Sequence, residues 1–348
     1  MNVSIEVGHP AHVHYWRWVR QGLLDRGHRV SVLARGKETT FRLLDALGIP
    51  FVEVGRNYPT IVGKGLGMFA NSWDVLREAT REGVDMMLSG GMPYSAQASA
   101  ILDVPHLAII DTEHASLTLA ATIPFTDVVC TPACFRRSFR GPKHARFRGY
   151  VESMYLRPEH FTPRMEVLDR LGLEAGTPFS VVRFSSWDSS HDMFAVRTGL
   201  ETVAGRERLV RELEAFGPVF VSSEVPLPAS MERFRLTLPL EDIHSLLHYA
   251  WLSCGEGAKM AAEAGVLGTP WLYIAPVGRS YLDEQESAYG LGRTVGDLGS
   301  AIAQARAWLG MPDLKKEWAK KRERLISDTV DVTQFVLREI DELARRDT

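Results

Sequence analysis

The sequence predicts an α/β protein with two doubly wound parallel-sheet (Rossmann-like) domains that face an interdomain cleft. First, a chain of 348 residues is too long for one ordinary hydrophobic core. Second, short apolar strands alternate with helical segments along both halves, as in parallel sheets. Third, a proline-rich stretch over 149–163 interrupts this alternation near the middle. We therefore expect domains at 1–163 and 164–328, and a C-terminal helix over 329–348 that packs back near the hinge.

The composition excludes several classes of protein. Hydrophobic residues at 45% and charged residues at 24% are typical of soluble globular proteins. A net charge of −3 gives no sign of a nucleic-acid partner. The three cysteines lack the spacing of a zinc or redox motif, and they are too few for a disulfide framework. With no apolar run of about 20 residues, we expect no membrane span and a cytoplasmic location.

The first half alternates strands and helices from its start. The expected strands cover 3–7, 29–34, 50–54, 85–89, 106–110 and 127–130. The expected helices cover 14–26, 38–47, 68–82 and 94–102, with a short one near Leu117. Gly27 and Gly48 follow the first two helices, where glycine commonly ends a helix. The stretch between Tyr58 and Ala70 is interpreted as a linker, and the basic run from Arg136 to Arg148 as a solvated surface.

The second half repeats the same pattern after the proline-rich stretch. The expected strands cover 179–184, 219–222, 250–254, 271–274 and 292–295. The expected helices cover 165–171, 201–216, 240–249, 258–266, 278–290, 297–309, 314–326 and 332–346. Both halves therefore predict parallel sheets with helices on their faces.

Ionisable side chains follow several of the expected strands, which is where ligands bind in doubly wound sheets. His9 follows the first strand, Asp111 and Glu113 follow the fifth, and His191 lies in the loop after 179–184. These four are the candidate catalytic residues. Simpler interpretations stay open, since Asp111 could cap a helix, His9 could satisfy loop amides, and His191 could lie on the surface. We expect no metal site, because a histidine-rich metal centre needs further ligands from a closed barrel.

One stretch, 250–276, has the features of a phosphate site. A strand ends in the turn Gly255-Glu256-Gly257 and leads into a helix of small residues. Such a turn points backbone N–H groups and the positive end of a helix dipole toward an anion. Glu263, about two turns into the helix, could accept hydrogen bonds from ribose hydroxyls. An ordinary buried βαβ unit is the alternative, because glycine is common in any such turn.

The segments GEGAKMAAEAGVLGTPWLYIAP and YLDEQESAYGL resemble the donor-binding region of two enzyme families of GT-B architecture. These are the N-acetylglucosaminyltransferase that makes lipid II and the non-hydrolysing UDP-N-acetylglucosamine 2-epimerases. The resemblance implies that Glu263 holds the ribose, that the turn holds the diphosphate, and that Glu284 and Gln285 lie near the sugar or phosphates. Ser186 and Met260 complete the expected nucleotide-sugar-binding set.

Over most of the chain, the closest resemblance is to the GT-B-like family called domain of unknown function 354. Its hallmarks appear as GHPAHVHYWR, DTEHA, TPACF, GYVESMYLRPEHFTP and RFSSWDSSHD. One position departs from the family pattern Gly-x-Gly-Thr, since Ala258 supplies no hydroxyl. In addition, Glu256 places a negative charge beside the expected diphosphate, which costs affinity unless the side chain points away.

These features favour a metal-independent, GT-B-type glycosyltransferase of glycan or surface polysaccharide synthesis. It would use a nucleotide-diphosphate sugar, with a UDP-sugar favoured, and an unknown acceptor, without a tightly bound cofactor. His9, Asp111 or Glu113 would deprotonate the acceptor hydroxyl. Two alternatives stay open: a sugar-nucleotide 2-epimerase using Asp111, Glu113 and His191, and a degenerate GT-B domain with a non-catalytic binding role. The chain could form a homodimer, as epimerase relatives commonly do.

Overall fold

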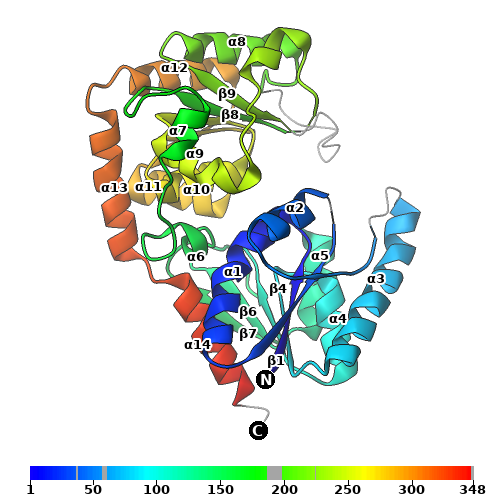
Figure 1. Ribbon diagram of the computed structural model, residues 1–348. Helices are drawn as coiled ribbons and strands as arrows, with labels where there is room; N and C mark the ends of the chain where they lie inside the picture. Colours follow the sequence, from blue (N-terminus) through cyan, green and yellow to red (C-terminus); the bar gives the residue numbers. More distant parts are fainter. Residues whose placement is uncertain (37, 57–60, 186–197, 224, 346–348) are drawn as a thin grey trace. The chain divides into compact units, whose positions relative to one another are not determined.

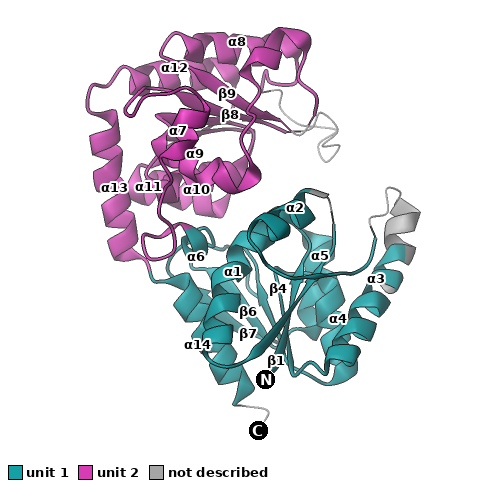
Figure 2. Cartoon of the chain, viewed as in Figure 1, with its two compact units in different colours: residues 1–155, 330–348 teal, residues 156–329 magenta. Residues whose placement is uncertain are grey.

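The structure is a computed structural model that describes residues 1–36, 38–56, 61–185, 198–223 and 225–345. The chain forms two compact units (Figure 2). Unit 1 comprises Met1–Tyr155 together with Val330–Thr348, and unit 2 comprises Leu156–Thr329. Each unit is built on one parallel sheet with flanking helices (Figure 1), which confirms the predicted fold class of two Rossmann-like domains. The division between the units falls inside the proline-rich 149–163 stretch.

Unit 1 contains a seven-stranded sheet in the order β3-β2-β1-β4-β5-β6-β7, and every neighbouring pair is parallel. The strands are β1 (Asn2–Val7), β2 (Arg29–Ala34), β3 (Val52–Glu53), β4 (Met86–Ser89), β5 (His106–Ile109), β6 (Val128–Pro132) and β7 (Lys143–Phe147). The prediction of a solvated surface for the basic run was wrong at β7. Ala145 and Phe147 are buried, so alternate residues of this run face the core.

Helices cover both faces of the first sheet. They are α1 (Pro10–Asp25), α2 (Glu38–Ala46), α3 (Ile61–Glu82), α4 (Pro93–Leu102), α5 (Ser116–Thr122), the 3₁₀ turn η1 (Ile123–Phe125), α6 (Ser153–Leu156) and α14 (Val332–Ala344). Helix α3 begins within the stretch that was interpreted as a linker. Helix α14 packs on α1, where Leu337 lies so close to Gly22 that a Cβ there would approach it to 2.6 Å. Arg26 and Asp341 join the same two helices by an ion pair of 2.9 Å.

Unit 2 contains a five-stranded parallel sheet in the order β12-β11-β10-β8-β9. The strands are β8 (Ser180–Phe184), β9 (Val219–Ser223), β10 (Leu252–Gly255), β11 (Trp271–Ile274) and β12 (Gly292–Val295). The α-helices are α7 (Glu166–Arg170), α8 (Val203–Glu214), α9 (Ile243–Tyr249), α10 (Ala258–Leu267), α11 (Ser280–Tyr289), α12 (Leu298–Leu309) and α13 (Leu314–Asp328). Two 3₁₀ turns, η2 (Ala229–Phe234) and η3 (Leu240–Asp242), precede α9.

Helix α13 fixes the C-terminal ends of three other helices in unit 2 through its cations. The bonds run from Lys315 Nζ to the carbonyl oxygens of His248 (2.9 Å) and Ala250 (2.8 Å), from Lys321 Nζ to Gly290 O (2.8 Å), and from Arg322 Nε to Val266 O (3.0 Å). These carbonyls lie at the ends of α9, α11 and α10, where positive charge complements the helix dipole. Helix α13 therefore anchors α10 at its C-terminal end, which also fixes the position of the α10 N-terminus.

Candidate functional site

The turn between β10 and α10 needs its glycines because Arg183 of β8 packs against it. Gly255 has a φ of +133°, and a Cβ there would lie 2.1 Å from the carbonyl oxygen of Arg183. A Cβ on Gly257 would lie 2.7 Å from Arg183 Cγ. The amide of Glu256 donates to Arg183 O at 2.9 Å. The two glycines thus bring the backbone close to a cationic side chain.

Sequence reasoning did not single out Arg183. The residue lies at the carboxyl end of β8, is half-buried, and donates from Nη1 to Ser222 Oγ at 2.7 Å. The available signal was its position, since an arginine interrupts the otherwise apolar end of SVVRF. A cation at this strand end lies where a parallel sheet binds ligands.

The N-terminus of α10 offers backbone amides. Among the described residues, no side chain caps it, and Gly257 occupies the N-cap position. The first intrahelical bond runs from Ala261 N to Gly257 O at 3.0 Å, so the amides of Ala258, Lys259 and Met260 precede it. Met260 and Lys259 are half-buried. Such an end attracts anions through its N–H groups and the helix dipole.

Glu256 points to a buried arginine. Its Oε2 accepts hydrogen bonds from the amide of Ser185 at 3.1 Å and from Arg206 Nη2 at 3.0 Å. Burial raises the pKa of the Glu256 carboxyl, and the charge of Arg206 opposes that rise. Because its charge is compensated by Arg206, Glu256 does not present a bare negative charge to the start of α10.

Glu263 is buried at 8% exposure in the second turn of α10. Its Oε1 lies 3.2 Å from Nε2 of His244, which is itself only 5% exposed. Sequence reasoning identified Glu263 but not His244. A histidine within the apolar helix α9 gave only a weak signal.

The structure places Gln285 in the core and not at the surface of the site. Its Oε1 accepts from Trp271 Nε1 at 3.0 Å, and its Nε2 donates to Ala262 O at 3.2 Å. The residue has no exposed surface, and a Cβ on Gly265 would lie 1.9 Å from Gln285 Oε1. The amide therefore joins α11 to α10 and β11, which does not fit the expected sugar contact. Its neighbour Glu284 is half-buried.

In unit 1, His9 forms the N-cap of α1. The side chain is exposed, and its Nδ1 accepts a hydrogen bond from the amide of Ala11 at 3.1 Å. This contact matches the simpler interpretation, in which His9 satisfies loop amides. A neutral imidazole that accepts at Nδ1 carries its proton on Nε2, so that nitrogen can only donate.

Asp111 lies at the carboxyl edge of the first sheet, and hydroxyl groups hold both of its carboxylate oxygens. Tyr15 of α1 donates its hydroxyl to Asp111 Oδ2 at 2.9 Å, and Thr112 Oγ1 donates to Oδ1 at 3.0 Å. Tyr15 is buried, and its ring stacks on Tyr155 with centroids 6.1 Å apart. Asp111 stays half-buried. Sequence reasoning missed Tyr15, although it lies on the inner side of the HVHYW segment.

Glu113 contributes to the shape of the loop after β6. Its carboxylate accepts a short hydrogen bond from the amide of Arg136, and its carbonyl accepts from Arg137 Nη1 at 3.0 Å. Arg146 supports the same loop through the carbonyls of Phe135 (2.7 Å) and Arg137 (2.8 Å). The guanidinium groups of Arg137 and Arg146 are thus engaged by backbone carbonyls of neighbouring segments.

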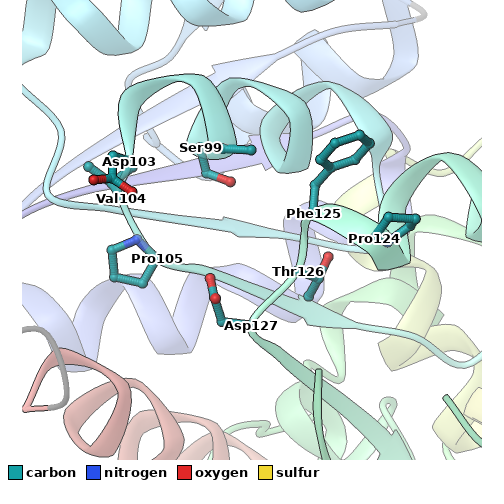
Figure 3. A pocket seen from close by; sticks show the side chains of 9 residues that line it. Ser99, Asp103, Val104, Pro105, Pro124, Phe125, Thr126 and Asp127 are labelled. Carbon is teal, nitrogen blue, oxygen red and sulfur yellow. The ribbon is translucent and has the colours of Figure 1, made fainter. Parts of the chain in front are cut away.

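Several predicted features lie elsewhere or are not seen. Ser186 and His191 fall outside the described residues. Within the described ranges, no group of three or more His, Cys, Asp or Glu side chains could hold a metal ion. None of the helices in the described part of the chain has the length and apolarity that crossing a bilayer requires. A hollow of about 340 Å³ lies at the amino ends of β5 and β6, near Asp103 and Asp127 (Figure 3), and contains none of the predicted site residues.

Neither a protein-family model nor a curated protein matches the chain. Solved structures match it over most of its length. A Listeria monocytogenes protein assigned as a UDP-N-acetylglucosamine 2-epimerase is 13% identical, with a TM-score of 0.68 over 92% of this chain and 90% of that one. MurG of Acinetobacter baumannii is 17% identical, with a TM-score of 0.60 over 98% and 99%. The glycosyltransferase VinC, solved in complex with DTDP, is 13% identical, with a TM-score of 0.64 over 99% and 100%. At these identities the likeness concerns the fold, and the chain has the two-domain fold of GT-B proteins.

Proposed function

We propose that this chain is a metal-independent glycosyltransferase of GT-B type that uses a nucleoside-diphosphate sugar, with UDP-sugars as the first donors to test. We also place it in the family called domain of unknown function 354, on the motifs quoted above. The observation that carries the proposal is the start of α10. A helix start whose N-cap residue is glycine, a glycine turn and Arg183 lie together there, and the only carboxylate in the turn is held by Arg206.

Unit 2 is assigned the donor. The amides of Ala258 to Met260 and the cations Arg183 and Lys259 would hold the diphosphate. The same groups would stabilise the negative charge that develops on the departing diphosphate, which removes the need for a metal ion. Glu263 is assigned the ribose, and Ser186 and Glu284 remain candidates for the sugar or phosphates. Gln285 is left out because its amide is buried.

Unit 1 is assigned the acceptor, with Asp111 as the general base. A base must accept a proton from the attacking hydroxyl, so its carboxylate must be held in one orientation. Tyr15 and Thr112 hold one oxygen each. His9 and Glu113 are weaker candidates, because backbone amides already occupy Nδ1 of His9 and the carboxylate of Glu113.

The second candidate function is epimerisation of a sugar nucleotide. It is favoured by the likeness in fold to the Listeria monocytogenes protein and by the Tyr15–Asp111 pair, which could take part in proton transfer at a sugar carbon. The two functions differ in one respect that is easy to measure. A transferase needs an acceptor, and an epimerase changes the sugar nucleotide alone.

The test is a binding and turnover screen on the full chain. UDP-, TDP-, GDP- and CDP-sugars are added at millimolar concentration in EDTA, and the melting temperature is recorded. A ligand that binds the native state raises it by mass action. Donors that bind are followed by proton NMR with and without candidate acceptors. Transfer that depends on an acceptor in EDTA supports the proposal, a changed sugar without acceptor supports the epimerase, and no shift with any nucleotide would refute both.

A further inference from the structure

The start of α2, in unit 1, also has the features of an anion site. Glycines there leave room for the side chain of Arg35, which directly follows β2. A Cβ on Gly8 would lie 3.3 Å from Arg35 Nη2, and a Cβ on Gly55 would lie 3.1 Å from Arg35 Cδ. Gly36 has a φ of +137°, and a Cβ on it would lie 3.4 Å from the carbonyl oxygen of Gly8. The glycines therefore let the turn before α2 and the guanidinium of Arg35 pack closely on the end of β1.

Arg35 places a positive charge at the carboxyl edge of the first sheet. Its guanidinium carbon lies 4.7 Å from the ring centroid of Tyr94, a contact that orients the group. The strand order reverses between β1 and β4, and doubly wound sheets bind ligands beyond the strand ends at such a point. Glu6 interacts with this charge, but burial raises the pKa of its carboxyl and thereby favours the uncharged form. Burial thus weakens the compensation that Glu6 gives to Arg35.

Thr40, in the first turn of α2, supplies an independent observation that points to a ligand. The residue has no exposed surface, and its Oγ1 has no hydrogen-bond partner among the described residues. A Cβ on Gly36 would lie 3.7 Å from Thr40 Oγ1, so the hydroxyl faces the turn before the helix. Gly36 itself is half-buried, which leaves this turn in contact with solvent. A completely buried hydroxyl normally has a partner in native proteins, and an oxygen bound at the turn would provide one.

The backbone of α2 adds amides to these side chains. The helix is nine residues long, and the first amides of a helix have no acceptor within it. They also form the positive end of the helix dipole, which attracts oxyanions. A guanidinium, a hydroxyl and backbone amides are the groups that commonly bind phosphate oxygens in proteins.

We infer that the start of α2 is an oxyanion site of unit 1, in which Arg35, Thr40 Oγ1 and the first amides of α2 hold a phosphate group. The site is separate from the donor site proposed at α10 in unit 2. It goes beyond the proposed function and does not depend on the transferase assignment. The phosphate group can belong to a free ion or to an organic phosphate, since both present the same oxygens.

The test is a titration of the full chain with inorganic phosphate, followed by ¹H–¹⁵N TROSY NMR at constant ionic strength. The amide signals of Gly36 and Thr40 report on the start of α2, and those of Lys259 and Met260 report on the start of α10. We expect the α2 signals to shift saturably, with a dissociation constant on the order of 1 mM, and not to shift with sodium chloride. Unchanged Gly36 and Thr40 signals at about 20 mM phosphate would overturn the inference. Titration with UDP tests the α10 signals separately, so the two proposals can fail independently.

Two substitutions test the assigned side chains. Arg35→Gln removes the positive charge and should weaken phosphate binding at the α2 signals about tenfold. Thr40→Val keeps the shape but removes the hydroxyl, so binding should weaken about threefold while the melting temperature stays equal or rises. Arg42→Gln, at an exposed position on the same helix, is the control and should bind phosphate as the wild type does. Wild-type affinity in either the Arg35 or the Thr40 variant would contradict the site.

A second titration, with glucose 1-phosphate, distinguishes the two sources of the phosphate group. A lower dissociation constant than for inorganic phosphate at the Gly36 and Thr40 signals would identify an organic phosphate, because the sugar then adds contacts. An equal or higher dissociation constant would identify the free ion. Both results support an oxyanion site at α2, and the absence of a shift with both ligands would overturn it.

Discussion

Both units contain a strand that leads through a glycine turn into a helix. The two helix starts differ in their electrostatic surroundings. In unit 1, β4 leads through Gly90-Gly91-Met92 into α4, and in unit 2, β10 leads through Gly255-Glu256-Gly257 into α10. Both helices are ten residues long, and neither has a side-chain N-cap within the described residues. The two starts differ in how a nearby carboxylate is held. Glu6 accepts from the amide of Ser95 in the first turn of α4 at 2.9 Å, whereas Glu256 is turned to Arg206.

The start of α4 therefore already has an internal carboxyl group. Glu6 reaches it from β1 and is completely buried, and burial raises the pKa of its carboxyl, with Arg35 and the Ser95 hydrogen bonds opposing the rise. A phosphate would have to displace this carboxyl or share the same helix end with it. At α10, Arg206 draws the local carboxylate aside, and Arg183 adds positive charge. The surroundings of two similar turns thus differ in charge because of residues on neighbouring elements.

Removing Arg206 should have the largest effect on the difference between the starts of α4 and α10. Arg206→Met leaves Glu256 largely buried without its cation, and breaking such a pair by removing one partner costs about 3 kcal/mol of unfolding free energy. The remaining charge should also repel a diphosphate at α10, so nucleotide binding should fail. Urea unfolding and calorimetry measure the two effects. The double variant Arg206→Met/Glu256→Gln should recover part of the stability, and equal stabilities of single and double variants would contradict the pairing.

Glu6 should impose a pH dependence on the stability of unit 1. Its pKa is raised in the native state above the ordinary value of 4.5, so the native state holds this proton to higher pH than the unfolded state. Stability therefore falls as the pH rises above about 4.5, by at most about 1.4 kcal/mol per pH unit for one proton. Glu6→Gln should remove this part of the slope.

Urea unfolding of wild type and Glu6→Gln between pH 4 and pH 8 isolates the effect, because other titrating groups contribute to both proteins. One of these groups is His106. Burial lowers its pKa from the ordinary value of 6.5 to about 3, so the protein loses stability as the pH falls below 6.5. Parallel pH profiles for the two proteins would show that Glu6 titrates normally.

Arg183 should matter chiefly for nucleotide binding. Arg183→Gln removes a charge-assisted contact to the diphosphate, and we expect about tenfold weaker UDP binding, which corresponds to about 1.4 kcal/mol. Arg211→Gln is the matched control, since Arg211 is an exposed arginine of the same unit, 71% exposed on α8. If both variants bind UDP as the wild type does, the diphosphate does not lie at Arg183.

More of the fold than of the candidate site could be predicted from the sequence. Hydrophobic periodicity, together with the glycine and proline residues between elements, predicted both parallel sheets, because strand and helix patterns are local in the sequence. Strand β7 was not predicted, because it lies in the basic run. Its two buried residues alternate there with charged residues, and such a segment resembles an exposed one in the sequence. The spacing predicted a donor site at the turn Gly255-Glu256-Gly257 and Glu263, but it did not point to Arg206, His244 or Tyr15. Each of these lies far along the chain from the carboxylate that it orients, so only the folded structure could connect them. The sugar contact expected of Gln285 does not fit the structure. Its side-chain oxygen accepts from Trp271, which lies on another element, and the sequence did not indicate this contact.

The smallest expected effect concerns the residue that departs from the family pattern. Ala258→Thr adds a hydroxyl at the first position of α10, where it can donate to a phosphate oxygen. One hydrogen bond of this kind contributes about 0.5–1 kcal/mol net, so UDP should bind about two- to fivefold tighter. Ala307→Thr, at an exposed position on α12, is the control and should leave binding unchanged. The result also sharpens the contrast between the helix starts: a gain at α10 means that its end faces the diphosphate, whereas weaker or equal binding means that Glu256 and Arg206 still govern this turn and that the diphosphate lies away from it.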